Sequence, residues 1–185
     1  MIELSASHEY TVDGQRFPGV TEILAATGLV RYFNADPWFL ERGTAIHSAT
    51  AMIDNGTLDW GSVDSRITGF LDAYMKFKEE TFMTYWEHIE EPLAHPTYRF
   101  CGCPDRWNDE YLLDIKGVQG YAIQIESYAE LLRANGFNPG RTGYMLHLKE
   151  DGTYKLEAHK FDRRLLGVFL SAVSVFHYRK EKGLI

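Results

Sequence analysis

Two acidic residues and a lysine form the densest group of side chains in this sequence that could do chemistry. Asp105 follows Pro104, and Asp114-Ile115-Lys116 comes a few residues later. Residues two apart on a β-strand point to the same face, so Asp114 and Lys116 would share a face while Ile115 points into apolar core. A carboxylate and an ammonium buried together are costly unless a ligand uses them. A divalent cation and a phosphate group would use both.

Antiparallel pairing would bring Asp105 beside Asp114. Two carboxylates, a backbone carbonyl such as that of Ile115 and water are ligands that suit Mg²⁺ or Mn²⁺. Lys116 would then hold or deprotonate the attacking water, or stabilise charge on the phosphate. The alternative is an ordinary salt bridge between strands, because Asp-x-Lys is a short pattern with many chance matches.

Three further residues lie on predicted helices. His47 could add an imidazole ligand, which would favour Mn²⁺ as well as Mg²⁺, or it could be a structural histidine. Gln124 and Tyr128 are four residues apart, so they share one helix face and can reach the same substrate. The alternative is that Tyr128 belongs to the core and Gln124 to the surface.

Together these residues resemble the RecB-like branch of the PD-(D/E)XK nuclease superfamily, and in particular its small phage-encoded exonucleases. The similarity runs from about residue 10 to residue 160, and the segment 18–24 also resembles a leader segment of those phage proteins. The motifs that carry the resemblance are, in chain order, Arg42-Gly43-Thr44-x-x-His47, Gly102-x-Pro104-Asp105, Asp114-Ile115-Lys116 and Gln124-x-x-x-Tyr128.

The resemblance implies a role for each matching position. The family often has Glu four residues after the motif histidine, where this chain has Ala51. Family members with an iron–sulfur cluster carry four cysteines, and this chain has only Cys101 and Cys103, so no such cluster is expected. The implied metal ligands are His47, Asp105, Asp114 and the carbonyl of Ile115. The implied catalytic residues are Lys116, Asp114 and Asp105. The resemblance also implies that Gln124 and Tyr128 organise the site and contact the nucleic acid.

Hydrophobic periodicity indicates the elements that must position these groups. Apolar residues at helical spacing predict helices over 21–26, 38–54, 64–86, 121–135 and 162–182. Alternating or β-branched runs predict hairpins over 9–17 and 144–158, and two strands joined near 107–110. This order predicts an α/β fold for a single domain, 1–185, with a central mixed sheet flanked by helices and a restriction-endonuclease-like core.

The charge of the chain is acidic overall and unevenly distributed. The 185 residues have a net charge of −7, which argues against a nonspecific polyanion binder. Residues 1–132 hold 9 basic and 21 acidic side chains, whereas residues 133–185 hold 10 basic and 5 acidic ones. This asymmetry indicates an anionic partner that meets one face, or else a solvated basic helix.

Sequence features also indicate the compartment. The chain has no uncharged apolar run near the ~20 residues of a membrane helix, and Met1–Tyr10 has no apolar signal-peptide core. Cys101 and Cys103 are too close in sequence for a disulfide with each other. We therefore expect a reduced, cytoplasmic protein, in the host cytoplasm if phage-encoded. A weaker alternative uses the two cysteines with His95 or His47 as zinc ligands.

These observations predict a Mg²⁺- or Mn²⁺-dependent deoxyribonuclease, an exonuclease of phage-type DNA recombination, replication or repair. We expect the protein to bind DNA and not to associate with a membrane. Its protein partner would be either further copies of itself or a recombination or replication protein. The alternative is a nucleic-acid- or protein-binding module on the same fold that is inactive or only weakly catalytic. The basic residues expected to hold the substrate backbone are Arg42, Arg106, Arg141, Arg163 and Arg164.

Overall fold

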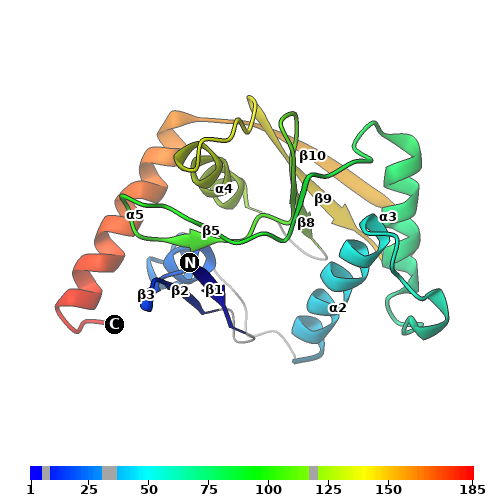
Figure 1. Cartoon of the computed structure of the whole chain (residues 1–185), viewed down its shortest axis with the longest axis horizontal. Coiled ribbons are helices and arrows are strands. Elements are labelled where there is room, and N and C mark those ends of the chain that lie inside the picture. Colours follow the sequence, from blue (N-terminus) through cyan, green and yellow to red (C-terminus); the bar gives the residue numbers. More distant parts are fainter. Residues whose placement is uncertain (6–8, 31–36, 117–120) are drawn as a thin grey trace.

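A mixed five-stranded sheet forms the centre of the protein (Figure 1). The computed structural model describes residues 1–5, 9–30, 37–116 and 121–185. The strand order is β10-β9-β8-β7-β4, with β8 and β9 parallel and every other neighbouring pair antiparallel. The strands are β4 (His88–Ile89), β7 (Arg106–Trp107), β8 (Leu112–Lys116), β9 (Thr142–Leu148) and β10 (Tyr154–Lys160).

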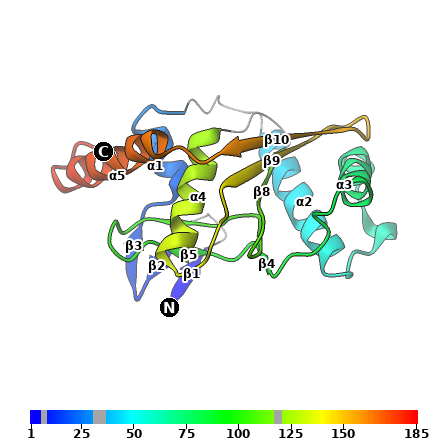
Figure 2. The same ribbon diagram turned by 90° about the horizontal axis from the view of Figure 1, so that it is seen from above.

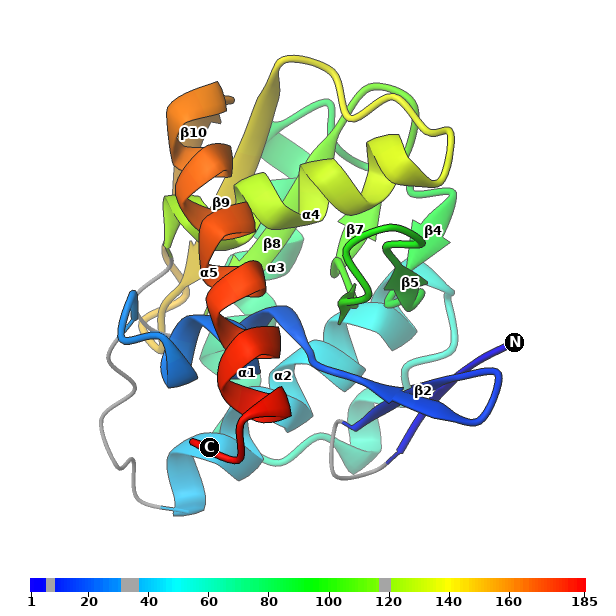
Figure 3. The ribbon, with the colours of Figure 1, turned by 90° about the vertical axis from the view of Figure 1, so that its left-hand side faces the viewer.

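Helices cover both faces of this sheet (Figure 2). One apolar cluster joins Leu112 of β8 to α1, α4 and α5, and α4 and α5 lie in front of the strands in Figure 3. A second cluster joins Leu113 and Ile115 to α2 and α3 on the other face. The helices are α1 (Val20–Ala26), α2 (Pro37–Asp54), α3 (Thr68–Glu80), α4 (Ala122–Ala134) and α5 (Arg163–Glu181), with a short 3₁₀ turn η1 (Trp60–Ser62). The predicted α/β class with a mixed sheet between helices is confirmed.

Two small sheets flank the central one. The predicted N-terminal hairpin turns at Asp13 (φ 50°) and Gly14 (φ 77°), a backbone that suits a two-residue hairpin loop. None of the helices in the described ranges has the length and apolarity that a bilayer span requires. The strands of the small sheets are β1 (Ile2–Leu4), β2 (Tyr10–Val12) and β3 (Gln15–Phe17) in one, and β5 (Leu93–Ala94) and β6 (Cys101–Gly102) in the other.

The helix predicted over 64–86 is shorter at both ends than expected. The carboxylate of Asp64 accepts the backbone N–H of Arg66 at 2.9 Å, which stabilises a turn before the helix. At the other end, Thr81 has extended backbone angles (φ −127°, ψ 166°), so α3 stops at Glu80. Met83 and Trp86 lie beyond the end of α3 but are buried. Their apolar side chains continue the helical spacing in the sequence, which is why the predicted helix was too long.

The first turn of α3 packs directly on the turn between β9 and β10. A Cβ atom on Gly69 would lie 1.8 Å from the carbonyl oxygen of Glu150 and 2.7 Å from its carbonyl carbon. Both of these are backbone atoms of a tight turn, so they cannot swing away as the end of a flexible side chain could. Glycine at position 69 therefore sets how closely this helix approaches the sheet.

We expect Gly69→Ala to lower the free energy of unfolding by about 2 kcal/mol, because overpacking forces backbone apart. The matched control is Gly167→Ala, since Gly167 lies in α5 and a Cβ there would meet no described atom within 4 Å. That control should be stabilising by up to about 1 kcal/mol through helix propensity. Urea denaturation measures both variants, and equal effects of the same sign would contradict the packing argument.

Candidate active site

The two aspartates meet across the central pair of antiparallel strands. Arg106 pairs with Leu113, so one further step of the same register sets Asp105 opposite Asp114. A turn organised by Asn108 fixes that register, because its side-chain oxygen accepts the backbone N–H groups of the two residues before β8, at 2.9 and 2.8 Å. Asp105 Oδ2 also accepts the backbone N–H of Ile115 at 2.5 Å. The expected pairing of the two carboxylates is confirmed.

The alternation predicted for Asp114-Ile115-Lys116 is present in β8. Ile115 is fully buried in the cluster with α2 and α3, while Asp114 and Lys116 lie on the other face. Lys116 Nζ is 2.9 Å from Asp114 Oδ2, and the two side chains are 17% and 2% exposed. The salt bridge foreseen as the alternative is therefore present, and it occupies a nearly buried position beside a second carboxylate.

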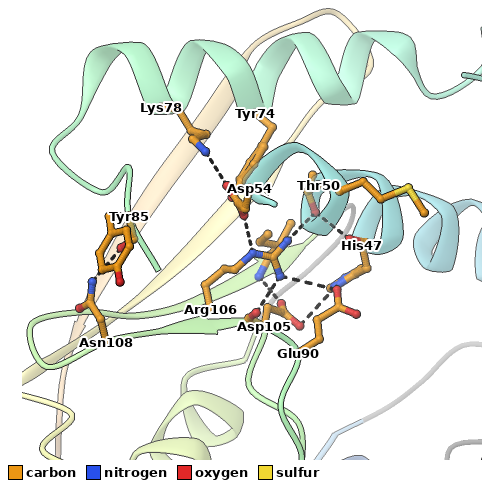
Figure 4. Close-up of polar contacts among 12 residues, drawn as sticks. His47, Thr50, Asp54, Tyr74, Lys78, Tyr85, Glu90, Asp105, Arg106 and Asn108 are labelled. Atoms are coloured by element: carbon orange, nitrogen blue, oxygen red, sulfur yellow. Dashed lines mark hydrogen bonds and ion pairs between the residues drawn. The ribbon is translucent and has the colours of Figure 1, made fainter. Parts of the chain in front are cut away.

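His47, on α2, lies beside Asp105. Its Nδ1 is 3.3 Å from Asp105 Oδ1, and its side chain is 30% exposed (Figure 4). The negative charge of Asp105 raises the pKa of His47, although burial and the charge of Lys116 act in the opposite direction. The structure thus brings together an imidazole from α2, Asp114 and Lys116 from β8, and Asp105 from the position directly before β7.

The pKa values of the two aspartates are shifted in opposite directions. Burial raises the pKa of Asp114 to about 6, against the attraction of Lys116. Burial also opposes ionisation of Asp105, but His47, Lys116 and the N–H of Ile115 outweigh it and leave the pKa of Asp105 below its usual value. Asp114 is thus a buried acid whose ionised form needs more positive charge than Lys116 alone supplies.

Gln124 and Tyr128 form one side of the site from α4. Gln124 Nε2 donates to Tyr128 Oη at 3.0 Å, and both residues are buried. Burial, followed by the charges of Asp114 and Asp105, raises the pKa of Tyr128 well above its usual value. Gly102 makes room for the tyrosine ring, because a Cβ there would lie 2.9 Å from it. The shared helix face is confirmed, Tyr128 belongs to the apolar core, and Gln124 is buried rather than on the surface.

The expectation that Arg106 holds the substrate backbone does not fit the structure. Its side chain is fully buried, and its Nε lies 2.6 Å from Asp54 Oδ2. Its two terminal nitrogens donate to the carbonyl oxygen of Asp105 at 2.7 Å and to Thr50 Oγ1 at 3.2 Å (Figure 4). Arg106 is therefore a structural link between α2 and β7, because a phosphate could reach it only if these contacts broke.

The other predicted basic residues lie away from the aspartates or are engaged with rings. Arg42 lies over the rings of Phe39 and Phe70, at 4.8 and 5.0 Å from their centroids. Arg164 is exposed at the start of α5. Arg141 and Arg163 line a cavity of about 780 Å³ between α4, the first residues of β9 and the start of α5, together with Arg133 and Lys160.

Two acidic residues near the site carried no sequence signal. Asp54 accepts Arg106, the hydroxyl of Tyr74 and the ammonium of Lys78, each at 2.6 Å. Glu90 follows β4, and its Oε1 lies 3.9 Å from His47 Nδ1. Glu90 comes to the site through the packing of a distant segment, whereas Asp54 lies two turns after His47 on α2. Neither belongs to a short motif.

The imidazole and carboxylates of the site are ligands that suit a divalent cation such as Mg²⁺ or Mn²⁺. In this structure, however, they do not surround a single point. Within the described part of the chain, no three His, Cys, Asp or Glu side chains stand at mutual positions that would hold a metal as they are. One carboxylate oxygen nevertheless fits such an ion: Glu90 Oε1 is buried and accepts no hydrogen bond from any described residue. Asp114 Oδ2, also buried, contacts the ammonium of Lys116 at 2.9 Å. An imidazole with oxygen ligands suits Mn²⁺ or Mg²⁺.

The zinc alternative is not supported at the cysteines. Burial raises the pKa of both Cys101 and Cys103 to about 12, so both thiols are protonated in the metal-free chain. Within the described residues, neither belongs to a group of three side chains placed to hold a metal. His95 is already engaged, because its Nδ1 accepts the backbone N–H groups of Thr97 and Tyr98.

Comparisons with known proteins support the architecture. No family model matches the chain, and no curated protein matches it. Solved structures do match. A protein from Eubacterium rectale named "putative exonuclease" matches over 89% of this chain and 74% of its own, with 12% identity and a TM-score of 0.55.

The alkaline exonuclease LHK-Exo from Laribacter hongkongensis also matches. It aligns over 87% of this chain and 76% of its own, with 16% identity and a TM-score of 0.51. Its complex with dAMP aligns over 90% and 89%, with 14% identity and a TM-score of 0.50. At these identities the likeness concerns the fold, and the chain has the α/β fold of these exonuclease structures.

Proposed function

We propose that the protein is a metal-dependent DNA nuclease that acts as an exonuclease. The observation that carries the proposal is the meeting of Asp105, Asp114 and Lys116 on paired strands, with His47 within 3.3 Å of Asp105. The likeness of the fold to exonuclease structures supports the same reaction class. We place this activity in phage-type DNA recombination, replication or repair.

Each side chain has a defined task in this proposal. Asp105, Asp114 and His47 would hold Mg²⁺ or Mn²⁺, together with the carbonyl of Ile115. When bound, the cation would supply the Lewis-acid charge that allows water to attack phosphorus at neutral pH. Lys116 would orient that water and stabilise the negative charge that grows on the phosphate.

The tyrosine and glutamine would position the reacting groups. Their mutual hydrogen bond fixes Tyr128 Oη beside the two aspartates, and the raised pKa keeps this hydroxyl protonated as a donor. A protonated hydroxyl can donate to a phosphate oxygen, whereas a phenolate would repel it. Arg42, Arg141, Arg163 and Arg164 remain candidates for contacts to the DNA backbone, and binding should weaken as salt rises.

The test is digestion of matched linear and circular DNA, single- and double-stranded, with Mn²⁺, Mg²⁺ or EDTA. We expect degradation of linear DNA with either metal and none in EDTA, with closed circles left intact because an exonuclease needs an end. Cleavage of closed circles would contradict the exonuclease assignment. The absence of metal-dependent cleavage on every DNA would contradict the nuclease and favour a binding module on this fold.

A further inference from the structure

Glu90 is held beside the candidate active site by its backbone. It directly follows β4, and its N–H donates to the carbonyl oxygen of Asp105 at 2.9 Å. Its φ of 50° lies in the left-handed region, which is unfavourable for a side chain of this kind. Non-glycine residues kept in this region are strained and occur often at functional sites. The fold therefore maintains an unfavourable backbone at the residue that brings a second acid next to His47.

The carboxylate of Glu90 has two long ion-pair contacts but no hydrogen bond to Oε1 from the described residues. Its Oε1 is buried. His47 Nδ1 and Arg106 Nη1 lie 3.9 and 3.6 Å from it, both beyond hydrogen-bond length (Figure 4). The side chain as a whole is 35% exposed, so the group lies at the boundary between the site and solvent.

The charge of Arg106 is shared between Glu90 and Asp54, and Asp54 is the closer partner, with 2.6 Å from its Oδ2 to Nε against 3.6 Å from Glu90 Oε1 to Nη1 of Arg106. Its Nε, Nη1 and Nη2 already donate to Asp54, to the carbonyl oxygen of Asp105 and to Thr50, at 2.6, 2.7 and 3.2 Å. Glu90 is therefore a second carboxylate near an imidazole that Asp105 already contacts at 3.3 Å. Two carboxylates that share one imidazole repel each other, and a cation between them would remove that repulsion.

We propose that Glu90 is an additional carboxylate ligand of the divalent cation, binding it directly or through water on the His47 and Asp105 side of the site. The inference rests on the proposed metal dependence and extends it to a residue outside the motifs. The ion belongs to the oxygen-preferring class of Mg²⁺ and Mn²⁺.

The experiment measures Mn²⁺ binding to the full chain without DNA, by calorimetric titration and by the rise in Tm that Mn²⁺ produces. The variants are Glu90→Gln, Glu90→Asp and the control Glu87→Gln, which removes an exposed acid three residues earlier. We expect Glu90→Gln to weaken Mn²⁺ affinity by about tenfold or more, as the loss of a group that supports a metal site does. Glu90→Asp keeps the charge and should recover part of the affinity, and Glu87→Gln should match the parent chain.

A purely structural role for Glu90 gives a different result. Glu90→Gln would then lower the Tm in EDTA and leave the Mn²⁺ affinity within twofold of the parent, which would overturn the inference. An affinity of Glu90→Gln equal to that of Glu87→Gln would overturn it as well. If the parent chain binds no Mn²⁺ and cleaves no DNA, the proposed function itself fails; if the parent does both and Glu90→Gln binds normally, only the role of Glu90 fails.

Discussion

We expect Lys116→Met to lower kcat for the proposed Mn²⁺-dependent DNA cleavage by about 10²–10³-fold, the loss expected when one charge that stabilises the transition state is removed. Lys116 Nζ is 2.9 Å from Asp114, on a strand with neighbours on both sides, so its position is fixed before substrate binds. Asp114→Asn should cause a loss at least as large, because it removes a proposed metal ligand. Initial rates at saturating DNA and Mn²⁺ measure both effects.

The fold must survive these changes for the rates to be informative. Lys116→Met leaves a buried carboxyl without its ion pair, but burial already raises the pKa of Asp114 to about 6, so this group can take up a proton and become neutral. The double variant Asp114→Asn, Lys116→Met removes both charges and should keep the parent circular dichroism spectrum. Lys149→Met, at an exposed position in the β9–β10 turn, is the control for loss of a lysine. Cleavage retained in both single variants would refute the assignment of the active site.

The second large effect concerns stability. We expect Arg106→Met to lower the free energy of unfolding by about 3 kcal/mol, because removing one partner of a buried ion pair leaves the other charge uncompensated. The side chains of Arg106 and Asp54 are 0% and 3% exposed, and Thr50 and the Asp105 carbonyl lose a donor at the same time. Lys78 still pairs with Asp54 at 2.6 Å, which keeps the loss at the lower end of the range for buried pairs.

Urea denaturation in EDTA measures this loss without any contribution from bound metal. Arg164→Met is the control, because Arg164 is exposed and should stay within about 0.5 kcal/mol of the parent. Arg106→Lys should also destabilise the protein, since a single ammonium cannot replace three directed donors. A loss below 1 kcal/mol for Arg106→Met would contradict the structural role given to this arginine.

Local patterns were enough to predict the part of the site that lies on β8 and on the helices. The alternation of Asp114, Ile115 and Lys116 needs only the period of a strand, and the shared face of Gln124 and Tyr128 needs only the period of a helix. Both were confirmed, as were the mixed sheet and its flanking helices. The roles of these residues in binding and catalysis stay predictions.

What depends on distant packing could not be predicted. β4 is two residues long, too short for an alternating pattern, so nothing in the sequence placed Glu90 beside His47. The charge of Arg106 suggested a surface contact with phosphate, whereas its side chain points toward α2 and pairs with Asp54. The helix predicted over 64–86 was too long, because buried apolar residues beyond Glu80 continued its pattern without its backbone.

The position of β8 in the sheet has a consequence for when the protein can first act. Its parallel neighbour β9 is separated from it in the chain by α4, so the sheet around Asp114 and Lys116 closes only after residues up to Leu148 have left the ribosome. Parallel pairing across such a crossover is a late, non-local step in folding. A chain still being synthesised would therefore carry the β7–β8 hairpin, with its acids and lysine, before β9 covers the free edge of β8.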